Sequence, residues 1–136
     1  MRVLIEKIRI LDHKEPWWKG RGEIVFDVRV YTPNFGGIER LTRLPESGFY
    51  SASKKPRRSV IRLEKEVFND YVVDELAIQM SGTELDTFDP NDYLGMYQRA
   101  FVREPKTWFG SYGPGDEPVE PESLECWQVW YRIEPA

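Results

Sequence analysis

Residues 23–31 read Glu-Ile-Val-Phe-Asp-Val-Arg-Val-Tyr, and this stretch is the clearest guide to the fold. Every second residue from Ile24 to Val30 is apolar, whereas Asp27 and Arg29 place charges in the row between them. Successive side chains of a β-strand point to opposite faces, so the pattern predicts a strand with one buried face and one polar face. Strands of this kind are typical of antiparallel sheets that cover a core on one side only.

Seven further runs have the composition of strands. Two of them, residues 74–80 and 124–134, repeat the alternation of apolar and polar side chains. The others are residues 3–11, 38–44, 49–52, 60–68 and 93–103. We therefore expect an all-β fold, a single antiparallel β-sandwich of about seven or eight strands with almost no helix. Its predicted core contains Phe26, Val28, Leu76, Ile78, Trp127 and Tyr131.

Residues 105–122 differ from these runs because they are rich in glycine, proline and acidic residues. We expect them to form a long connection with little regular structure. The length of 136 residues suits one domain, which we place at residues 1–136. No apolar run approaches the roughly 20 residues that a membrane-spanning helix needs, and the first residues do not resemble an export signal.

The two halves of the chain carry opposite charge. Residues 1–70 contain 15 basic and 10 acidic side chains, whereas residues 71–136 contain 4 and 13, so the halves carry +5 and −9. Binding to nucleic acid favours a continuous basic surface, so we expect no nucleic-acid partner. A single cysteine, Cys126, and a single histidine, His13, exclude an intramolecular disulfide and a zinc cluster. A cytoplasmic location fits this composition best.

Four carboxylates lie close together in residues 81–95, which read Ser-Gly-Thr-Glu-Leu-Asp-Thr-Phe-Asp-Pro-Asn-Asp-Tyr-Leu-Gly. We expect these residues to form a loop between two strands. At an effective dielectric constant near 20, two such charges about 4 Å apart oppose each other by roughly 4 kcal/mol. Calcium, which takes six to eight oxygen ligands, would relieve this repulsion, although a solvated acidic turn explains the same residues. An EF-hand is excluded because Asn91 stands where that loop needs glycine.

The spacing of these carboxylates resembles the third calcium loop of C2 domains. The strand-like run at 74–80 is followed by Glu84-x-Asp86, five residues, and then Asp92-Tyr-Leu-Gly. Glu84 stands where the family has its first aspartate. The resemblance implies a divergent C2-like β-sandwich that binds calcium and phospholipid. It also implies a set of metal ligands, in which Asp12 and Glu23 look like the first-loop positions: Asp12, Glu23, Glu84, Asp86 and Asp92.

In this family, the calcium loops often present apolar side chains to a phospholipid surface. Trp17, Trp18 and Phe88 are similarly placed, although a tryptophan that packs under a long loop is the alternative. The basic cluster that contacts anionic lipid in related domains looks like Lys54, Lys55, Arg57 and Arg58. Each basic residue near such a surface contributes about 1 kcal/mol. The expected partner is therefore an anionic membrane surface or a protein, and in the first case the chain would be a peripheral membrane protein.

Two other functions compete with this interpretation. The first is a metal-independent protein-interaction sandwich whose partner surface includes Trp108, Tyr112 and residues 116–122. The second is a carbohydrate-binding module, since such modules are also calcium-bearing sandwiches. We expect no catalysis, because the sole histidine, His13, and the sole cysteine, Cys126, do not form a recognisable set of catalytic nucleophile and general base in the sequence.

Overall fold

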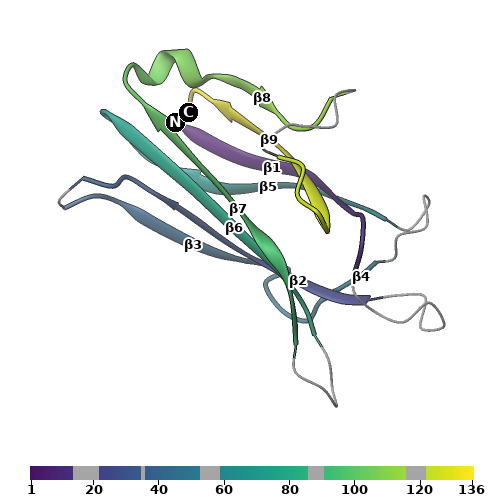
Figure 1. Cartoon of the computed structure of the whole chain (residues 1–136). Coiled ribbons are helices and arrows are strands. Elements are labelled where there is room, and N and C mark those ends of the chain that lie inside the picture. The colour runs from purple at the N-terminus through teal and green to yellow at the C-terminus, as the bar shows by residue number, and fades with distance from the viewer. Residues whose placement is uncertain (14–21, 35, 53–58, 86–90, 116–121) are drawn as a thin grey trace.

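Two antiparallel β-sheets pack face to face in the computed structural model, which describes residues 1–13, 22–34, 36–52, 59–85, 91–115 and 122–136 (Figure 1). The predicted antiparallel β-sandwich is therefore confirmed. The described residues form nine strands: β1 (Arg2–Ile10), β2 (Gly22–Tyr31), β3 (Glu39–Leu44), β4 (Tyr50–Ala52), β5 (Val60–Asn69), β6 (Glu75–Glu84), β7 (Asp92–Val102), β8 (Gly110–Tyr112) and β9 (Trp127–Glu134). In the described part of the chain, no helix has the length and apolar composition to cross a membrane.

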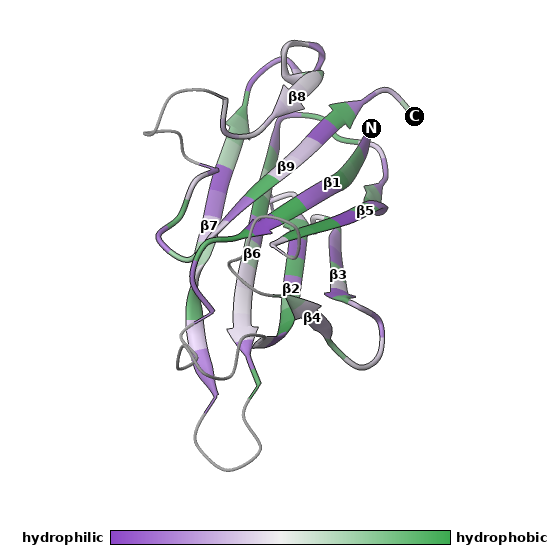
Figure 2. Cartoon of the chain, turned by 90° about the vertical axis from the view of Figure 1, so that its right-hand side faces the viewer, coloured by the Kyte–Doolittle hydropathy of each residue, from purple (hydrophilic) through white to green (hydrophobic). Residues whose placement is uncertain are grey.

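The four-stranded sheet has the order β5-β1-β9-β8. The five-stranded sheet has the order β3-β2-β6-β7, and β4 pairs with β2 beyond the end of β3. All six core residues predicted from the alternation are buried: Phe26, Val28, Leu76, Ile78, Trp127 and Tyr131. Figure 2 shows the alternation as changes of colour along β9 and β1. The rings of Phe26 and Trp127 meet edge to face, 5.1 Å apart, and join the two sheets.

Two features of the fold differ from the sequence-based expectation. The segment expected to lack regular structure contains a 3-10 helix, η1 (Pro105–Trp108), and the strand β8. Three residues are too few to show alternation, and β8 exists because it pairs with the edge of β9.

The second difference concerns the acidic loop. Strand β6 continues to Glu84 and β7 already begins at Asp92, so these two carboxylates belong to strands and not to the loop. The sequence did not show that β6 continues past Met80 through Ser81, because the next core position is occupied by Gly82, which has no apolar side chain. A Cβ atom at Gly82 would lie 2.9 Å from the Phe26 ring, so only glycine fits beneath that ring.

One end of the sandwich collects the chain segments that the sequence linked to metal binding. Strands β1, β4 and β6 finish there, and β2, β5, β7 and β9 begin there, as the pairs Ile10↔Trp127, Gly22↔Ala52 and Glu84↔Asp92 show. We call this the loop end. The two chain termini lie side by side at the other end of the molecule (Figure 1).

Candidate functional site

Two carboxylates stand next to each other on neighbouring strands at the loop end. Glu84, the last residue of β6, pairs with Ile24 of β2 on one side and with Asp92 of β7 on the other. Paired residues of an antiparallel ladder share a face, so both carboxylates lie on the core-facing side, as Ile24 does. Glu84 is only 1% exposed, and Asp92 is half-buried. Like charges directly opposite each other destabilise a sheet, so this pair favours a nearby positive charge.

The chain segment that follows β1 packs against the same place. His13 is 2% exposed, and a Cβ atom at Gly22 would lie 2.9 Å from the His13 Cβ and 3.4 Å from the Glu84 Cγ. Glycine at position 22 therefore lets His13 and Glu84 approach the start of β2 from both sides. The backbone N–H of Glu23 donates a hydrogen bond to Glu84 Oε1 at 3.4 Å. Glu84 is thus held where β1 ends and β2 begins.

The other predicted ligands occupy different positions. Asp12 is exposed at the loop end, where its backbone N–H donates to the carbonyl of Cys126 at 3.0 Å. Cys126 itself is buried one residue before β9, not within the strand. Glu23 is exposed and adjoins the core-facing Ile24, so its side chain points to the outer face of the sheet, away from Glu84.

Several predicted site residues lie outside the described part of the chain. They are the ligand Asp86 and the contact residues Trp17, Trp18, Phe88, Lys54, Lys55, Arg57 and Arg58. Among the described residues, no group of three or more histidine, cysteine, aspartate or glutamate side chains is arranged to hold a metal ion. Because calcium takes six to eight oxygen ligands, Glu84 and Asp92 supply only part of a site. The remaining oxygen atoms would have to come from the β6–β7 connection and from the segment after β1.

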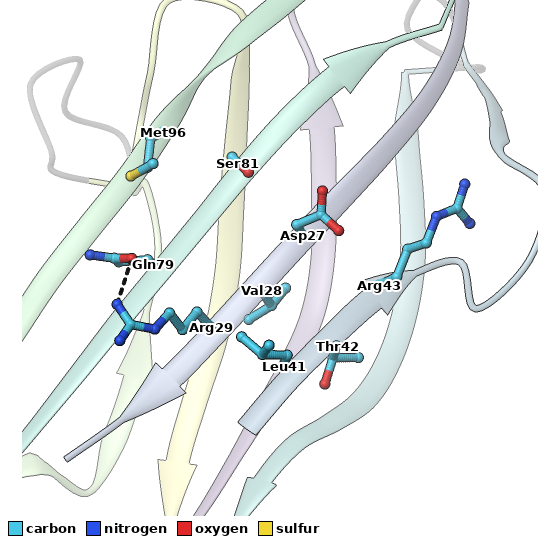
Figure 3. A pocket seen from close by; sticks show the side chains of 9 residues that line it. All are labelled: Asp27, Val28, Arg29, Leu41, Thr42, Arg43, Gln79, Ser81 and Met96. Atoms are coloured by element: carbon cyan, nitrogen blue, oxygen red, sulfur yellow. Dashed lines mark hydrogen bonds between the residues drawn. The ribbon is translucent and has the colours of Figure 1, made fainter. Parts of the chain in front are cut away.

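A separate groove crosses the outer face of the five-stranded sheet (Figure 3). It has a volume of about 500 Å³ and is lined by Asp27, Val28, Arg29, Leu41, Thr42, Arg43, Gln79, Ser81 and Met96. The ladder places four of these in one row across the strands: Arg43, Asp27, Ser81 and Met96. The groove is hollow at its centre because the short side chain of Ser81 stands between longer ones.

The charged side chains of this groove differ in how many hydrogen-bond partners they have. The Arg29 guanidinium donates to Glu39 Oε2 at 2.7 Å and to Gln79 Oε1 at 3.4 Å, and it stacks 3.8 Å from the Tyr31 ring. Arg43 donates to the backbone carbonyls of residues 45 and 48, and its guanidinium points away from the middle of the groove (Figure 3). No hydrogen bond or ion pair joins the exposed Asp27 carboxylate to another residue within the described ranges. Asp27 is therefore available to a ligand.

A buried polar cluster connects β7, an edge strand of the five-stranded sheet, with β9 of the other sheet. The Tyr97 hydroxyl donates to Glu122 Oε1 at 3.1 Å and lies 2.6 Å from the Tyr131 hydroxyl, while Arg99 Nη1 donates to the same Glu122 oxygen at 2.5 Å. Burial raises the pKa of both tyrosine hydroxyls, so both are neutral at physiological pH. The cluster ties Glu122, just before β9, to β7 and β9, which is a structural role.

Of the partner surface predicted from Trp108, Tyr112 and residues 116–122, Trp108 and Glu122 are buried, so the prediction is wrong for these two residues. Trp108 is 4% exposed and packs 5.9 Å from the Phe101 ring, and Tyr112 stacks 5.2 Å from the Tyr131 ring. Glu122 is buried, and residues 116–121 lie outside the described ranges. The rings of Trp108 and Tyr112, which the sequence analysis assigned to a partner surface, thus pack against aromatic rings of this chain.

The sequence indicated the groove residues only in part and did not indicate His13. The polar row of β2 marked Asp27 and Arg29 as outward-facing, but nothing local showed that Leu41, Gln79 and Met96 stand beside them. His13 carried no signal, because a lone histidine after a strand is ordinarily exposed. Neither a family model nor a curated protein matches this chain.

Proposed function

We propose that this chain is a calcium-responsive binding module whose loop end engages an anionic membrane surface, and that it binds without catalysing a reaction. The observation that supports this proposal is the pairing of Glu84 with Asp92 on one face at the loop end. Two adjacent carboxylates, one of them buried, are stabilised by a cation. Glu84 and Asp92 both offer carboxylate oxygen atoms, the hard donors that calcium prefers.

In this proposal, Glu84 and Asp92 hold the ion together with Asp86, and Asp12 contributes from the segment after β1. Glu23 is not among the ligands, because its side chain points to the outer face. Bound calcium would supply positive charge at the loop end, which neutralises the carboxylates and favours contact with lipid phosphate. Magnesium should act weakly, because it demands a tighter octahedral shell and loses water reluctantly.

Calcium titration by calorimetry and thermal unfolding tests the proposal. Calcium at one hundred times its dissociation constant should stabilise the fold by about 2.7 kcal/mol, with a much smaller effect of magnesium. Asp92→Asn should weaken this response because it removes one charge from the ligand set. Glu23→Gln is the matched control, since it removes one carboxylate charge from the same end on the opposite face, and it should leave the response unchanged.

Equal melting temperatures in millimolar calcium and in chelator would contradict the calcium proposal. A metal-independent interaction module would then be the better function, and the groove on the outer face favours it specifically. That groove combines the available Asp27 carboxylate with Leu41, which is 71% exposed. Binding of a protein partner in chelator, weakened by Asp27→Asn, would support this second function. Binding to insoluble polysaccharide would instead support a carbohydrate-binding module.

A further inference from the structure

The outer face of the four-stranded sheet carries a cluster of cations around one aromatic ring. The ladder places Arg62 of β5, Lys7 of β1 and Trp130 of β9 in one row, and Arg9 lies two residues further along β1. Arg9 and Arg62 are exposed, and Lys7 is half-buried. We call Lys7, Arg9, Arg62 and Trp130 the basic–tryptophan patch. It adjoins the loop end, because Arg9 is one residue from the end of β1.

Within the described ranges, no carboxylate balances the charges of this patch, unlike those further along the same face. There, Arg132 contacts Glu6, Glu64 and Glu134 at 3.2, 2.9 and 3.1 Å. Arg2 contacts Glu66 and Glu134 at 2.7 and 2.8 Å.

By contrast, no carboxylate within the described ranges lies at ion-pair distance from Lys7, Arg9 or Arg62. Lys7 and Arg62 are moreover directly opposite each other, an arrangement of like charges that destabilises a sheet. An anion bound at the patch would relieve this repulsion.

Trp130 holds two of the three cations, Lys7 and Arg9, in place without neutralising them. The Lys7 Nζ lies 4.7 Å and the Arg9 Cζ 5.6 Å from the centroid of its ring, within the range of cation–π attraction. The indole N–H donates to the carbonyl of Pro114 at 2.9 Å, which fixes the ring. The patch is therefore a positioned set of positive charges with an aromatic ring among them.

We propose that the basic–tryptophan patch is a calcium-independent docking surface for an anionic phospholipid bilayer. The choice of a bilayer rests on the proposed function, which brings the adjoining loop end to a membrane. Charge complementarity supports it, because the three cations lie on the part of this face that adjoins the loop end, whereas the glutamates lie further along the face in ion pairs. The tryptophan ring also suits the polar–apolar boundary of a bilayer.

Co-sedimentation with vesicles in chelator and low salt tests this proposal. The full chain should bind vesicles of phosphatidylcholine with about 30% phosphatidylserine, in which roughly one lipid in three is anionic. Arg9→Gln/Arg62→Gln should weaken the binding by roughly 25-fold, since each basic residue near an anionic surface contributes about fivefold. The control Arg103→Gln/Lys106→Gln removes the same charge from exposed positions at the other end, and it should change the affinity by less than about threefold.

Equal affinity of the patch variant and the unaltered chain would overturn the proposal, as would equal binding to pure phosphatidylcholine or no binding to the anionic vesicles. Neither double variant should melt well below the unaltered chain, because the replaced side chains are exposed and Arg62→Gln also removes the repulsion from Lys7. Repeating the assay with calcium separates the two proposals. Binding in chelator that calcium does not increase would support the patch and reject calcium-dependent engagement, whereas binding only in calcium would do the reverse.

Discussion

Burial raises the pKa of the Tyr97 and Tyr131 hydroxyls, because ionising either one would place a negative charge between the two sheets. In the unfolded chain both hydroxyls titrate near pH 10. Since the folded pKa is the higher one, this contribution to stability is fully present below about pH 10 and is lost as the pH rises through the folded pKa. The fold should therefore be sensitive to alkali.

We predict that the free energy of unfolding falls above about pH 10, by about 1.4 kcal/mol per pH unit for each buried tyrosine. Denaturant unfolding at pH 9, 10 and 11 measures this slope. Tyr131→Phe should make the slope shallower by one tyrosine. Tyr71→Phe is the matched control, because Tyr71 is 81% exposed, and it should keep the slope of the unaltered chain. A stability that is constant across this range would contradict the assignment of the two hydroxyls as neutral and buried.

At the scale of elements, the ion pair between Arg99 and Glu122 attaches the segment before β9 to strand β7. The Glu122 side chain is 3% exposed, whereas that of Arg99 is 35% exposed, so solvent screens only one partner. Removing the arginine would leave a buried carboxylate without its counter-charge, which costs more than the pair itself contributes. The hydrogen bond from Tyr97 would be its remaining contact within the cluster.

We predict that Arg99→Met lowers the free energy of unfolding by about 2 kcal/mol, less than for a fully buried pair because Arg99 is partly solvated. Arg99→Met/Glu122→Gln should be less destabilised than Arg99→Met alone, since no uncompensated charge remains. Arg40→Met, in the ion pair with Asp70, is the control and should cost less than about 1 kcal/mol, because the Arg40 side chain is 53% exposed. Urea unfolding of the unaltered chain, these three variants and Glu122→Gln alone tests this, and additive effects at Arg99 and Glu122 would show that the two side chains act independently.

At the scale of the whole molecule, the last strand completes the fold. Strand β9 lies between β1 and β8, and it carries Trp127, Val129, Tyr131 and Ile133 into the core. Without β9, strand β1 would lose one of its two neighbours, and the Phe26 ring would lose its contact with the Trp127 ring. The N-terminal strand therefore depends on residues more than a hundred positions away.

We predict that a chain ending at Cys126 does not fold, because one edge of β1 loses its hydrogen-bonding partner and four core side chains are removed. A chain ending at Glu134 should fold normally, since only the exposed residues Pro135 and Ala136 are missing. Far-ultraviolet circular dichroism and thermal unfolding compare the two. A cooperative transition in the shorter chain would show that the remaining strands form a stable core of their own.

The sequence by itself determined most of the strands, and it determined the buried face of those whose side chains alternate. The rows Ile24–Val30 and Leu76–Met80 carry this information locally, because side chains of a strand alternate with a period of two residues. The core positions of Leu76 and Trp127 followed from that period alone. Strand β8 has only three residues, too few to show the alternation, and Gly82 interrupts the alternation along β6. For these reasons the sequence did not predict β8 or the end of β6.

Only the tertiary structure decided which residues of different strands stand together. Glu84 meets Asp92 on the core-facing side while Glu23 turns outward, and a register shift of one residue would reverse these faces. The row of Arg62, Lys7 and Trp130 likewise joins three strands that are far apart in the chain. Register is set by the burial of both sheets against each other, a property of the whole core that no single stretch of sequence contains.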